Sequence, residues 1–291
     1  MTVLVTGATG QVGRALVGEL QDRAMHVRAF VRDAARAGTL LGEDVELAVG
    51  DFGDRAAVRG ALEGAERVFL ACGNVPRQVE NEVTVIEAAR KAGVTRLVKL
   101  SAAGASADSP LLFPRRHAEI ERHLQASGVP ATVLQPSSYM TNVLASAESI
   151  RHTGKLFAPA GDARIAFVDP RDVAAVAAVA LMQDGHERPS HVLTGPEAIT
   201  YGRIAEELSR ATGTRVDYVD VPDEAACQGM LEAGIPTEVA HFLIALFGAF
   251  RDGLAAQTTE AVANVTGRAP RTFARFAADH TRLFAPAHVS T

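Results

Sequence analysis

The sequence has few of the residues that build disulfide frameworks, metal sites and membrane spans. It contains no tryptophan, three tyrosines and two cysteines in 291 residues. Cys72 and Cys227 form no Cys-x-x-Cys pair, so we expect a reducing compartment and no structural zinc or other metal site. The apolar stretches Val173–Met182 and Phe242–Phe250 are far shorter than the ~20 residues that span a bilayer.

An excess of basic residues is also missing. The formal net charge is −5, so we expect neither nucleic acid nor an anionic membrane as a partner. No charged leader precedes an apolar signal segment, which predicts a cytoplasmic protein. A hydrophobic content of 47% with 22% charged residues is typical of a globular chain with a substantial core.

The first seventeen residues carry the strongest pattern. The apolar run Val3–Val5 predicts a buried parallel strand, and apolar residues at helical spacing follow Gly13. Between them, Gly7 can form the sharp turn, Gly10 can let a diphosphate approach the backbone, and Gly13 can let helix and strand pack closely. The helix N-terminus then presents N–H groups to phosphate oxygens.

A glycine triplet can also be ordinary turn chemistry, because glycine is common in turns. Here the triplet follows a strand and opens a helix, which is the context that a dinucleotide site requires. No Gly-Lys-Ser/Thr ending is present, which argues against a triphosphate-binding loop.

Strand-like and helix-like segments alternate through the first 135 residues or so. Alternation of this kind predicts an α/β fold, a Rossmann-type doubly wound parallel sheet with right-handed crossovers. The further strands are expected at Val27–Val31, Val45–Val49, Val68–Ala71, Leu97–Leu100 and Ala131–Leu134. Helices are expected at Arg55–Leu62, Val79–Lys91 and His117–Ser127.

The alternation ends after Pro136, which suggests a second part of the chain. We expect a nucleotide-binding domain over residues 1–137 and a return to its sheet at about 163–195, with Asp172 as a helix N-cap. Residues 138–162 and 196–291 then form a smaller, mostly helical substrate lobe. Within it we expect Thr200 as an N-cap and a short strand at Arg215–Val219.

The end of the second strand decides which nicotinamide cofactor fits. A carboxylate there accepts from the ribose 2′-OH of NAD, whereas an arginine accommodates the 2′-phosphate of NADP. Arg32 stands at this position and Arg36 could assist it, so we expect NADP(H) to be preferred. Arg32 could also be a solvated strand end, and Asp33 could bind a ribose hydroxyl, so NAD(H) stays open.

Three segments together resemble a known superfamily. They are the Thr-Gly-Ala-Thr-Gly-Gln-Val-Gly motif at residues 6–13, Gly50–Asp54 after the third strand, and Lys-Leu-Ser-Ala at 99–102. With a weaker likeness at 266–273, the chain resembles the atypical short-chain dehydrogenases/reductases. Within them it is most similar to the NmrA-like group, which includes NADPH-dependent quinone reductases and redox-sensing regulators.

The resemblance implies a set of cofactor-binding residues. Asp51 and Phe52 would flank the adenine, although Asp51 could equally be a turn residue. The small residues at the end of the fourth strand would edge the ribose and nicotinamide. In order along the chain, the diphosphate turn and this edge comprise Gly7, Thr9, Gly10, Gln11, Val12, Gly13, Ala71, Cys72 and Gly73.

The Tyr-x-x-x-Lys pair of carbonyl-reducing members is replaced in this chain. Phe113 stands at the tyrosine position and His117 at the lysine position. By resemblance, His117 binds the ribose or nicotinamide or titrates near neutrality as a proton donor; alternatively it pairs with Glu121 on the helix surface. Ser101 could donate to a substrate carbonyl or simply end a strand or cap a helix.

Two further residues resemble pocket-lining positions of the group. Tyr139 could stack on a flat substrate or donate through its hydroxyl, or be a half-buried packing residue. Asn142 could orient an amide or carbonyl.

Two functions follow from the resemblance. The first is an NADP(H)-dependent oxidoreductase that transfers hydride directly to a small quinone-like or other conjugated carbonyl acceptor. The second is a non-catalytic NADP(H)-binding redox sensor, which the missing Tyr-x-x-x-Lys pair favours. Helices of this fold often pair across a two-fold axis, so the sequence is compatible with a homodimer.

Overall fold

The computed structural model describes residues 1–73, 75–184 and 190–286. The chain forms two compact units. Unit 1 comprises Met1–Pro136, Pro170–Leu193 and Ala261–Arg268, and unit 2 comprises Ser137–Asp169, Thr194–Glu260 and Ala269–Thr291. Within the described residues, no helix has the length and apolar character that crossing a bilayer requires.

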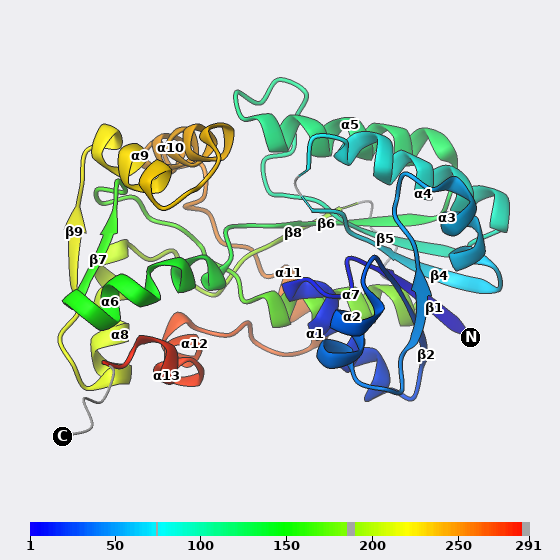
Figure 1. Cartoon of the computed structure of the whole chain (residues 1–291), viewed down its shortest axis with the longest axis horizontal. Coiled ribbons are helices and arrows are strands. Elements are labelled where there is room, and N and C mark those ends of the chain that lie inside the picture. The colour runs from blue at the N-terminus through cyan, green and yellow to red at the C-terminus, as the bar shows by residue number, and fades with distance from the viewer. Residues whose placement is uncertain (74, 185–189, 287–291) are drawn as a thin grey trace. The chain divides into compact units, whose positions relative to one another are not determined.

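Unit 1 is built on a parallel sheet, as the alternating pattern predicts. Among the described residues the sheet has seven strands in the order β3-β2-β1-β4-β5-β6-β8 (Figure 1). In this register Val5 of β1 pairs with Ala29 of β2 and with Phe69 of β4. The strands are β1 (Thr2–Thr6), β2 (His26–Val31), β3 (Glu46–Val49), β4 (Ala65–Leu70), β5 (Arg96–Leu100), β6 (Ala131–Pro136) and β8 (Ser190–Leu193).

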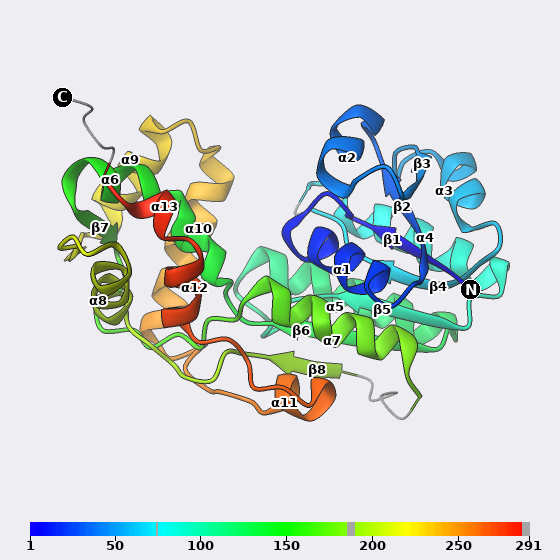
Figure 2. The same ribbon diagram turned by 90° about the horizontal axis from the view of Figure 1, so that it is seen from below.

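Helices cover both faces of this sheet, which confirms the doubly wound Rossmann-type fold. α3 (Arg55–Leu62), α4 (Gln78–Ala92) and α5 (Leu112–Ser127) lie on one face. α1 (Gln11–Gln21), α2 (Ala34–Leu41) and α7 (Pro170–Met182) lie on the other (Figures 1 and 2). α7 is almost entirely buried, and its alanine and valine side chains permit close packing against α1.

The strand order reverses between β1 and β4. From β1 the chain winds outward through β2 and β3, and from β4 it winds the opposite way through β5 and β6. Open α/β sheets bind ligands beyond the carboxyl ends of the strands at such a reversal. The glycine-rich turn follows β1, and Ala71–Gly73 follows β4, so both segments lie at this point.

Three expectations about unit 1 need correction. α5 begins at Leu112 rather than His117, because Pro114 is tolerated in the first turn of a helix. α7 begins at Pro170, a favoured first residue, so Asp172 is a buried first-turn residue and not the N-cap. The chain returns to the sheet only at β8, after α7.

A short helix near the C-terminus also belongs to unit 1. α11 (Ala261–Thr266) packs against α7 and β8 through its buried residues Val262 and Val265. The expectation that residues 196–291 lie wholly in the substrate lobe is therefore wrong for this helix. Two isolated valines are too weak a pattern to show which unit a six-residue helix joins.

Unit 2 is mostly helical around an aromatic core that includes Phe167, Tyr201, Phe250, Phe273 and Phe276. Thr200 is the N-cap of α8 (Tyr201–Thr212), as expected, and its side chain accepts a hydrogen bond from the Arg203 N–H. The expected strand at 215–219 is β9 (Asp217–Asp220), which pairs in parallel with β7 (Lys155–Ala158). The helices are η1 (Met140–Ser146), α6 (Ala147–Thr153), α8 (Tyr201–Thr212), α9 (Asp223–Glu232), α10 (Thr237–Arg251), α12 (Phe273–Asp279) and α13 (Thr281–Phe284).

Candidate functional site

The turn after β1 has room for glycine alone at two of its three glycine positions. Gly7 has a positive φ of 61°, and a Cβ on it would lie 2.9 Å from the Ala71 carbonyl oxygen. A Cβ on Gly13 would lie 2.2 Å from the Gly7 carbonyl oxygen, which is a severe clash. Gly10 closes the turn by donating its N–H to the Gly7 carbonyl at 2.9 Å. These contacts set the backbone path into α1.

The N-terminus of α1 is suited to an anion. Gly10 is the N-cap and provides no side-chain oxygen for the first N–H groups, and the first turn holds no acidic residue. Gly10 and Gln11 are exposed, Gly7 and Thr9 are half-buried, and Val12 and Gly13 are buried. The dipole and the N–H groups of a helix start favour phosphate oxygens, so this cradle fits the diphosphate of a dinucleotide. Val12 could contribute only backbone atoms.

Thr6 joins the two strand ends at the reversal point, a role that the sequence analysis missed. Its Oγ1 donates to the Ala71 carbonyl at 3.0 Å and accepts from the Ala71 N–H at 2.8 Å. The sequence signal for this role was a threonine at the end of a buried apolar strand, because its hydroxyl requires a hydrogen-bond partner there. The two bonds hold the glycine turn against the end of β4.

Arg32 directly follows β2 and is exposed. Within the described residues it has no ion-pair partner, so its guanidinium faces solvent. Asp33 is the N-cap of α2 and accepts the Arg36 N–H at 3.0 Å, so part of its hydrogen-bonding capacity is used by the helix. The end of β2 therefore presents the exposed Arg32 guanidinium, next to a carboxylate that caps α2.

Asp51 forms the turn that its alternative interpretation predicts. Its Oδ1 accepts the Gly53 N–H at 2.9 Å, and the side chain is exposed. Phe52 is half-buried, and its ring lies edge-on to Phe30 with centroids 5.5 Å apart. The adenine role of Asp51 and Phe52 remains a prediction.

The segment after β4 contains the buried Ala71, the half-buried Cys72 and the exposed Gly73. Burial, assisted by the nearby Glu82 carboxylate, raises the pKa of Cys72 to about 11. The thiol is therefore protonated at neutral pH and acts as a small apolar group at this edge.

A buried polar cluster of Lys99, Glu82, Gln78 and His117 lies beside this edge, and only His117 was predicted as a site residue. The Lys99 ammonium, on β5, lies 2.7 Å from the Glu82 carboxylate of α4, and neither side chain is exposed. The same ammonium lies 3.2 Å from His117 Nδ1 and donates to the Leu100 carbonyl at 2.8 Å. Gln78 Nε2 donates to Glu82 at 3.1 Å and lies 3.4 Å from His117 Nε2. The sequence signal for this cluster was Lys99 inside an otherwise apolar strand, because a buried ammonium requires a buried partner.

His117 is a buried member of this cluster and not a surface residue. Burial, and secondly the Lys99 charge, lowers the pKa of His117 to about 3. Two expectations are therefore wrong: His117 does not titrate near neutrality, and it does not pair with Glu121. The imidazole is neutral at physiological pH and accepts from a lysine.

Glu121 instead contacts Ser101. The Ser101 hydroxyl, at the end of β5, donates to Glu121 Oε1. Gln135 of β6 donates its amide to both Glu121 oxygens, at 3.1 and 3.2 Å. Ser101 is thus held by a carboxylate and is neither a free hydroxyl nor a helix cap.

Tyr139 and Asn142 belong to unit 2. Tyr139 is half-buried, burial raises the pKa of its phenol well above the usual range, and its backbone bridges to Val168. Asn142 is exposed and donates to the Ser138 hydroxyl at 3.1 Å. Their expected role as substrate-pocket residues remains a prediction.

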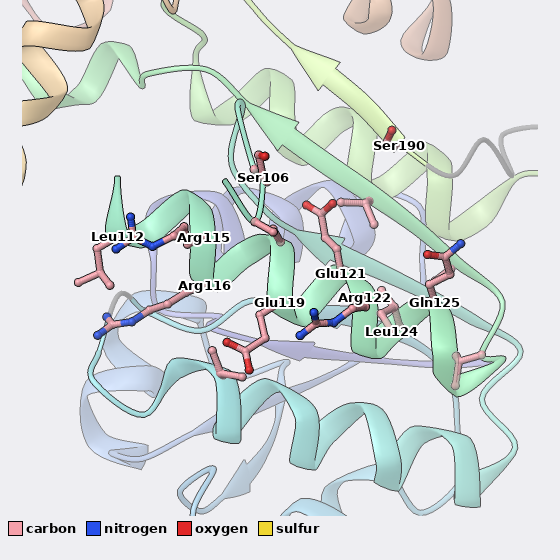
Figure 3. Close-up of a pocket in the computed structure, with 17 residues that line it drawn as sticks. Ser106, Leu112, Arg115, Arg116, Glu119, Glu121, Arg122, Leu124, Gln125 and Ser190 are labelled. Carbon is pink, nitrogen blue, oxygen red and sulfur yellow. The ribbon is translucent and has the colours of Figure 1, made fainter. Parts of the chain in front are cut away.

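Unit 1 also carries a groove of about 1040 Å³ beside α5 (Figure 3). Glu121 points from α5 toward β6, whereas Glu119 points to another side of the helix. None of the glycine-turn residues lines the groove, so it is distinct from the nucleotide cradle. The lining includes Ser106, Leu112, Arg115, Glu119, Glu121, Arg122, Val133 and Ser190.

Comparison with known proteins identifies the family. The chain matches the NmrA-like family over residues 1–277. It is 37% identical over 285 residues to an NAD(P)H azoreductase of Xenophilus azovorans, covering 98% of this chain and 100% of that protein. It is 41% identical over 285 residues to a (4-alkanoyl-5-oxo-2,5-dihydrofuran-3-yl)methyl phosphate reductase of Streptomyces griseus, covering 98% and 99%.

A solved structure agrees with these matches. The NADPH complex of an NADPH-dependent quinone oxidoreductase from Escherichia coli superimposes with a TM-score of 0.86 and 30% identity, covering 95% of this chain and 99% of that one. The match extends over both units. The protein therefore belongs to the NmrA-like family.

Proposed function

We propose that the protein is an NAD(P)H-dependent oxidoreductase that transfers hydride to a small quinone-like or other conjugated carbonyl acceptor. The glycine cradle at the reversal point of the sheet carries this proposal, because Gly7 and Gly13 leave space for nothing larger than hydrogen. The relatives support it, since they are named as an azoreductase, a reductase of an oxo-dihydrofuran phosphate and a quinone oxidoreductase.

NADPH is the proposed cofactor in preference to NADH. Arg32 directly follows β2, is exposed and has no ion-pair partner among the described residues. A guanidinium there can hold the 2′-phosphate through paired charge-assisted bonds, whereas Asp33 is engaged as a helix cap. NADPH when bound supplies the hydride and thereby the two electrons of the reaction.

The chain's own residues position the acceptor and supply the proton to its oxygen. Ser101 lies at the end of β5, and the resemblance assigns its hydroxyl to an acceptor oxygen. His117 is a neutral imidazole at neutral pH and not an imidazolium acid, so we assign it a positioning role beside the ribose and nicotinamide edge. Conjugated acceptors give stabilised oxyanions, so a weak donor such as serine or water suffices where the tyrosine is absent.

The test is a turnover assay with purified protein, NADPH, and separate quinone, enone and azo acceptors. We expect NADPH oxidation that depends on the acceptor, and transfer of deuterium from C4-deuterated NADPH into the product. Tight NADPH binding without turnover on any acceptor would contradict the proposal and favour the redox sensor.

Cytoplasmic location and a homodimer are further proposals. Cell fractionation tests the first. Light scattering of the purified protein tests the second.

A further inference from the structure

Ser101 and Glu121 form a contact that the proposed hydride transfer does not by itself use. Ser101 is only 5% exposed, and its hydroxyl donates to Glu121 Oε1. Gln135 holds both carboxylate oxygens at 3.1 and 3.2 Å. The carboxylate is therefore fixed in orientation, with one oxygen on the serine hydroxyl.

Glu121 also reaches a different environment from that of Ser101. Its side chain is half-buried and lines the groove of about 1040 Å³ beside α5, and it points toward β6 there (Figure 3). Ser101 does not line this groove. One carboxylate thus connects a buried hydroxyl at the end of β5 with a space large enough for many water molecules.

We propose that Glu121 is a positioning residue that relays a proton from the groove to Ser101, and through Ser101 to the oxygen of the reduced acceptor. The proposal rests on the function proposed above. It assigns the groove beside α5 as the solvent entrance for protons. The glycine cradle at the sheet reversal is left to the nucleotide.

The transfer balances as follows. Hydride adds to a carbon of the conjugated acceptor, whose carbonyl π electrons move to oxygen and give an oxyanion. The Ser101 hydroxyl proton passes to this oxyanion while a proton on Glu121 Oε1 passes to Ser101 Oγ. Ser101 is again a neutral hydroxyl, and Glu121 is left as a carboxylate that regains its proton from bulk solvent through the groove. A hydroxyl donating to a carboxylate, as in the structure, is the arrangement that this transfer leaves.

The other ionisable groups near the end of β5 are unsuited to this task. The Lys99 ammonium is held by Glu82 at 2.7 Å and donates to the Leu100 carbonyl. His117 accepts from that ammonium and is enclosed by Gln78. None of these side chains lines the groove. Glu121 is the carboxylate that contacts both Ser101 and the groove.

The principal test is Glu121→Gln, with Glu119→Gln as the matched control. Both glutamates lie on α5 and line the groove, but Glu119 points to another side of the helix (Figure 3). We expect Glu121→Gln to lower kcat about 100-fold, in the range of general acid catalysis. It should also change the pH–rate profile and the solvent deuterium isotope effect. KM and NADPH affinity should change less than about twofold, and Glu119→Gln should resemble the wild type.

A second readout needs neither cofactor nor acceptor. Infrared difference spectra of the cofactor-free protein, Ser101→Ala minus wild type, should show a shifted carboxylate band. The same comparison in a Glu121→Gln background should lack it. This result would establish the coupling even if a variant lowered activity by altering the fold.

The outcomes separate this proposal from the proposed function. If the wild type does not oxidise NADPH in the presence of any of the acceptors, the proposed function is contradicted. The infrared coupling between Ser101 and Glu121 is then judged by itself. A wild type that turns over, with a Glu121→Gln variant that keeps the pH profile and solvent isotope effect, overturns the relay. Absence of the infrared coupling overturns it as well.

Discussion

Lys99 and Glu82 form an ion pair of 2.7 Å from which solvent is wholly excluded. Burial raises the pKa of Glu82, and the adjacent ammonium opposes this rise. Taking two charges out of water is costly, so such a pair is retained only where its partners satisfy it. Here the Leu100 carbonyl and His117 contact the ammonium, and Gln78 donates to the carboxylate. The pair ties α4 to β5 next to the proposed nicotinamide edge.

Lys99→Met should destabilise the protein strongly, because it leaves the Glu82 carboxylate buried without a counter-charge. Breaking a buried pair costs about 3–5 kcal/mol. Urea unfolding of the variant at pH 7 measures this. The double variant Lys99→Met/Glu82→Leu should recover most of the loss.

The control for that prediction is the ion pair of Arg77 and Glu80, whose side chains are 70% and 65% exposed. Arg77→Met should cost less than about 1 kcal/mol. Equal decreases in the free energy of unfolding for Lys99→Met and Arg77→Met would contradict the prediction that the buried pair stabilises the fold more than the exposed one.

The lowered pKa of His117 predicts that the free energy of unfolding decreases at acidic pH. Its pKa is about 3 in the folded protein, below its ordinary value of 6.5, so the unfolded chain binds more protons between these values. Stability is therefore full above pH 6.5 and falls as the pH drops toward 3. Between pH 7 and pH 5 the contribution of His117 should decrease by about 2 kcal/mol.

This prediction is measured by urea unfolding at both pH values in the wild type and in His117→Gln, whose amide cannot titrate. The wild type should lose about 2 kcal/mol more than the variant. The matched control is His123→Gln, an exposed histidine on the same helix, which should keep the wild-type difference. Equal pH dependence in wild type and His117→Gln would show that His117 titrates as it does in water.

Gly13→Ala and Gly18→Ala should have opposite effects although both lie in α1. A Cβ on Gly13 would meet the Gly7 carbonyl oxygen at 2.2 Å, whereas a Cβ on Gly18 meets nothing within 4 Å. Gly13→Ala should lower stability by more than about 1 kcal/mol, typical of overpacking, and abolish NADPH binding. Gly18→Ala should raise stability by about 0.5–1 kcal/mol with unchanged binding.

Thermal unfolding and NADPH fluorescence titration measure both effects. Normal NADPH affinity in Gly13→Ala would separate the glycine turn from the cofactor.

Arg32→Glu should weaken NADPH binding about 10- to 100-fold, since bonds to charged groups contribute about 1.5–3 kcal/mol. NADH, which lacks the 2′-phosphate, should lose much less. Arg90→Glu makes the same charge change at an exposed position of α4 and should affect neither cofactor. Titration of each variant with both cofactors measures the ratio, and equal losses for NADPH and NADH would refute the role of Arg32.

Local patterns sufficed for the glycine turn after β1 and for the parallel strands. Gly7 and Gly13 were predictable because each is required by contacts with residues close in sequence or at the neighbouring strand end. The parallel strands were predictable because strands covered on both faces are continuous apolar runs. Thr200 was predictable because an N-cap acts on the next turn.

The buried polar contacts of His117 and Glu121 join segments that are distant in the sequence, and one sequence does not reveal such contacts. Helical spacing placed His117 and Glu121 on one face, but neighbouring elements selected different partners: Lys99 of β5 for the histidine and Ser101 for the glutamate. The late predicted start of α5 made His117 a first-turn residue, whereas the additional turn at Leu112 places it in the buried face.

A crystal structure of the protein with NADPH tests most directly whether the start of α1 holds the diphosphate. We expect the diphosphate oxygens within hydrogen-bonding distance of the first N–H groups of α1, and the 2′-phosphate against Arg32. A nucleotide bound away from the Gly7–Gly13 turn, or none at saturating NADPH, would contradict the account.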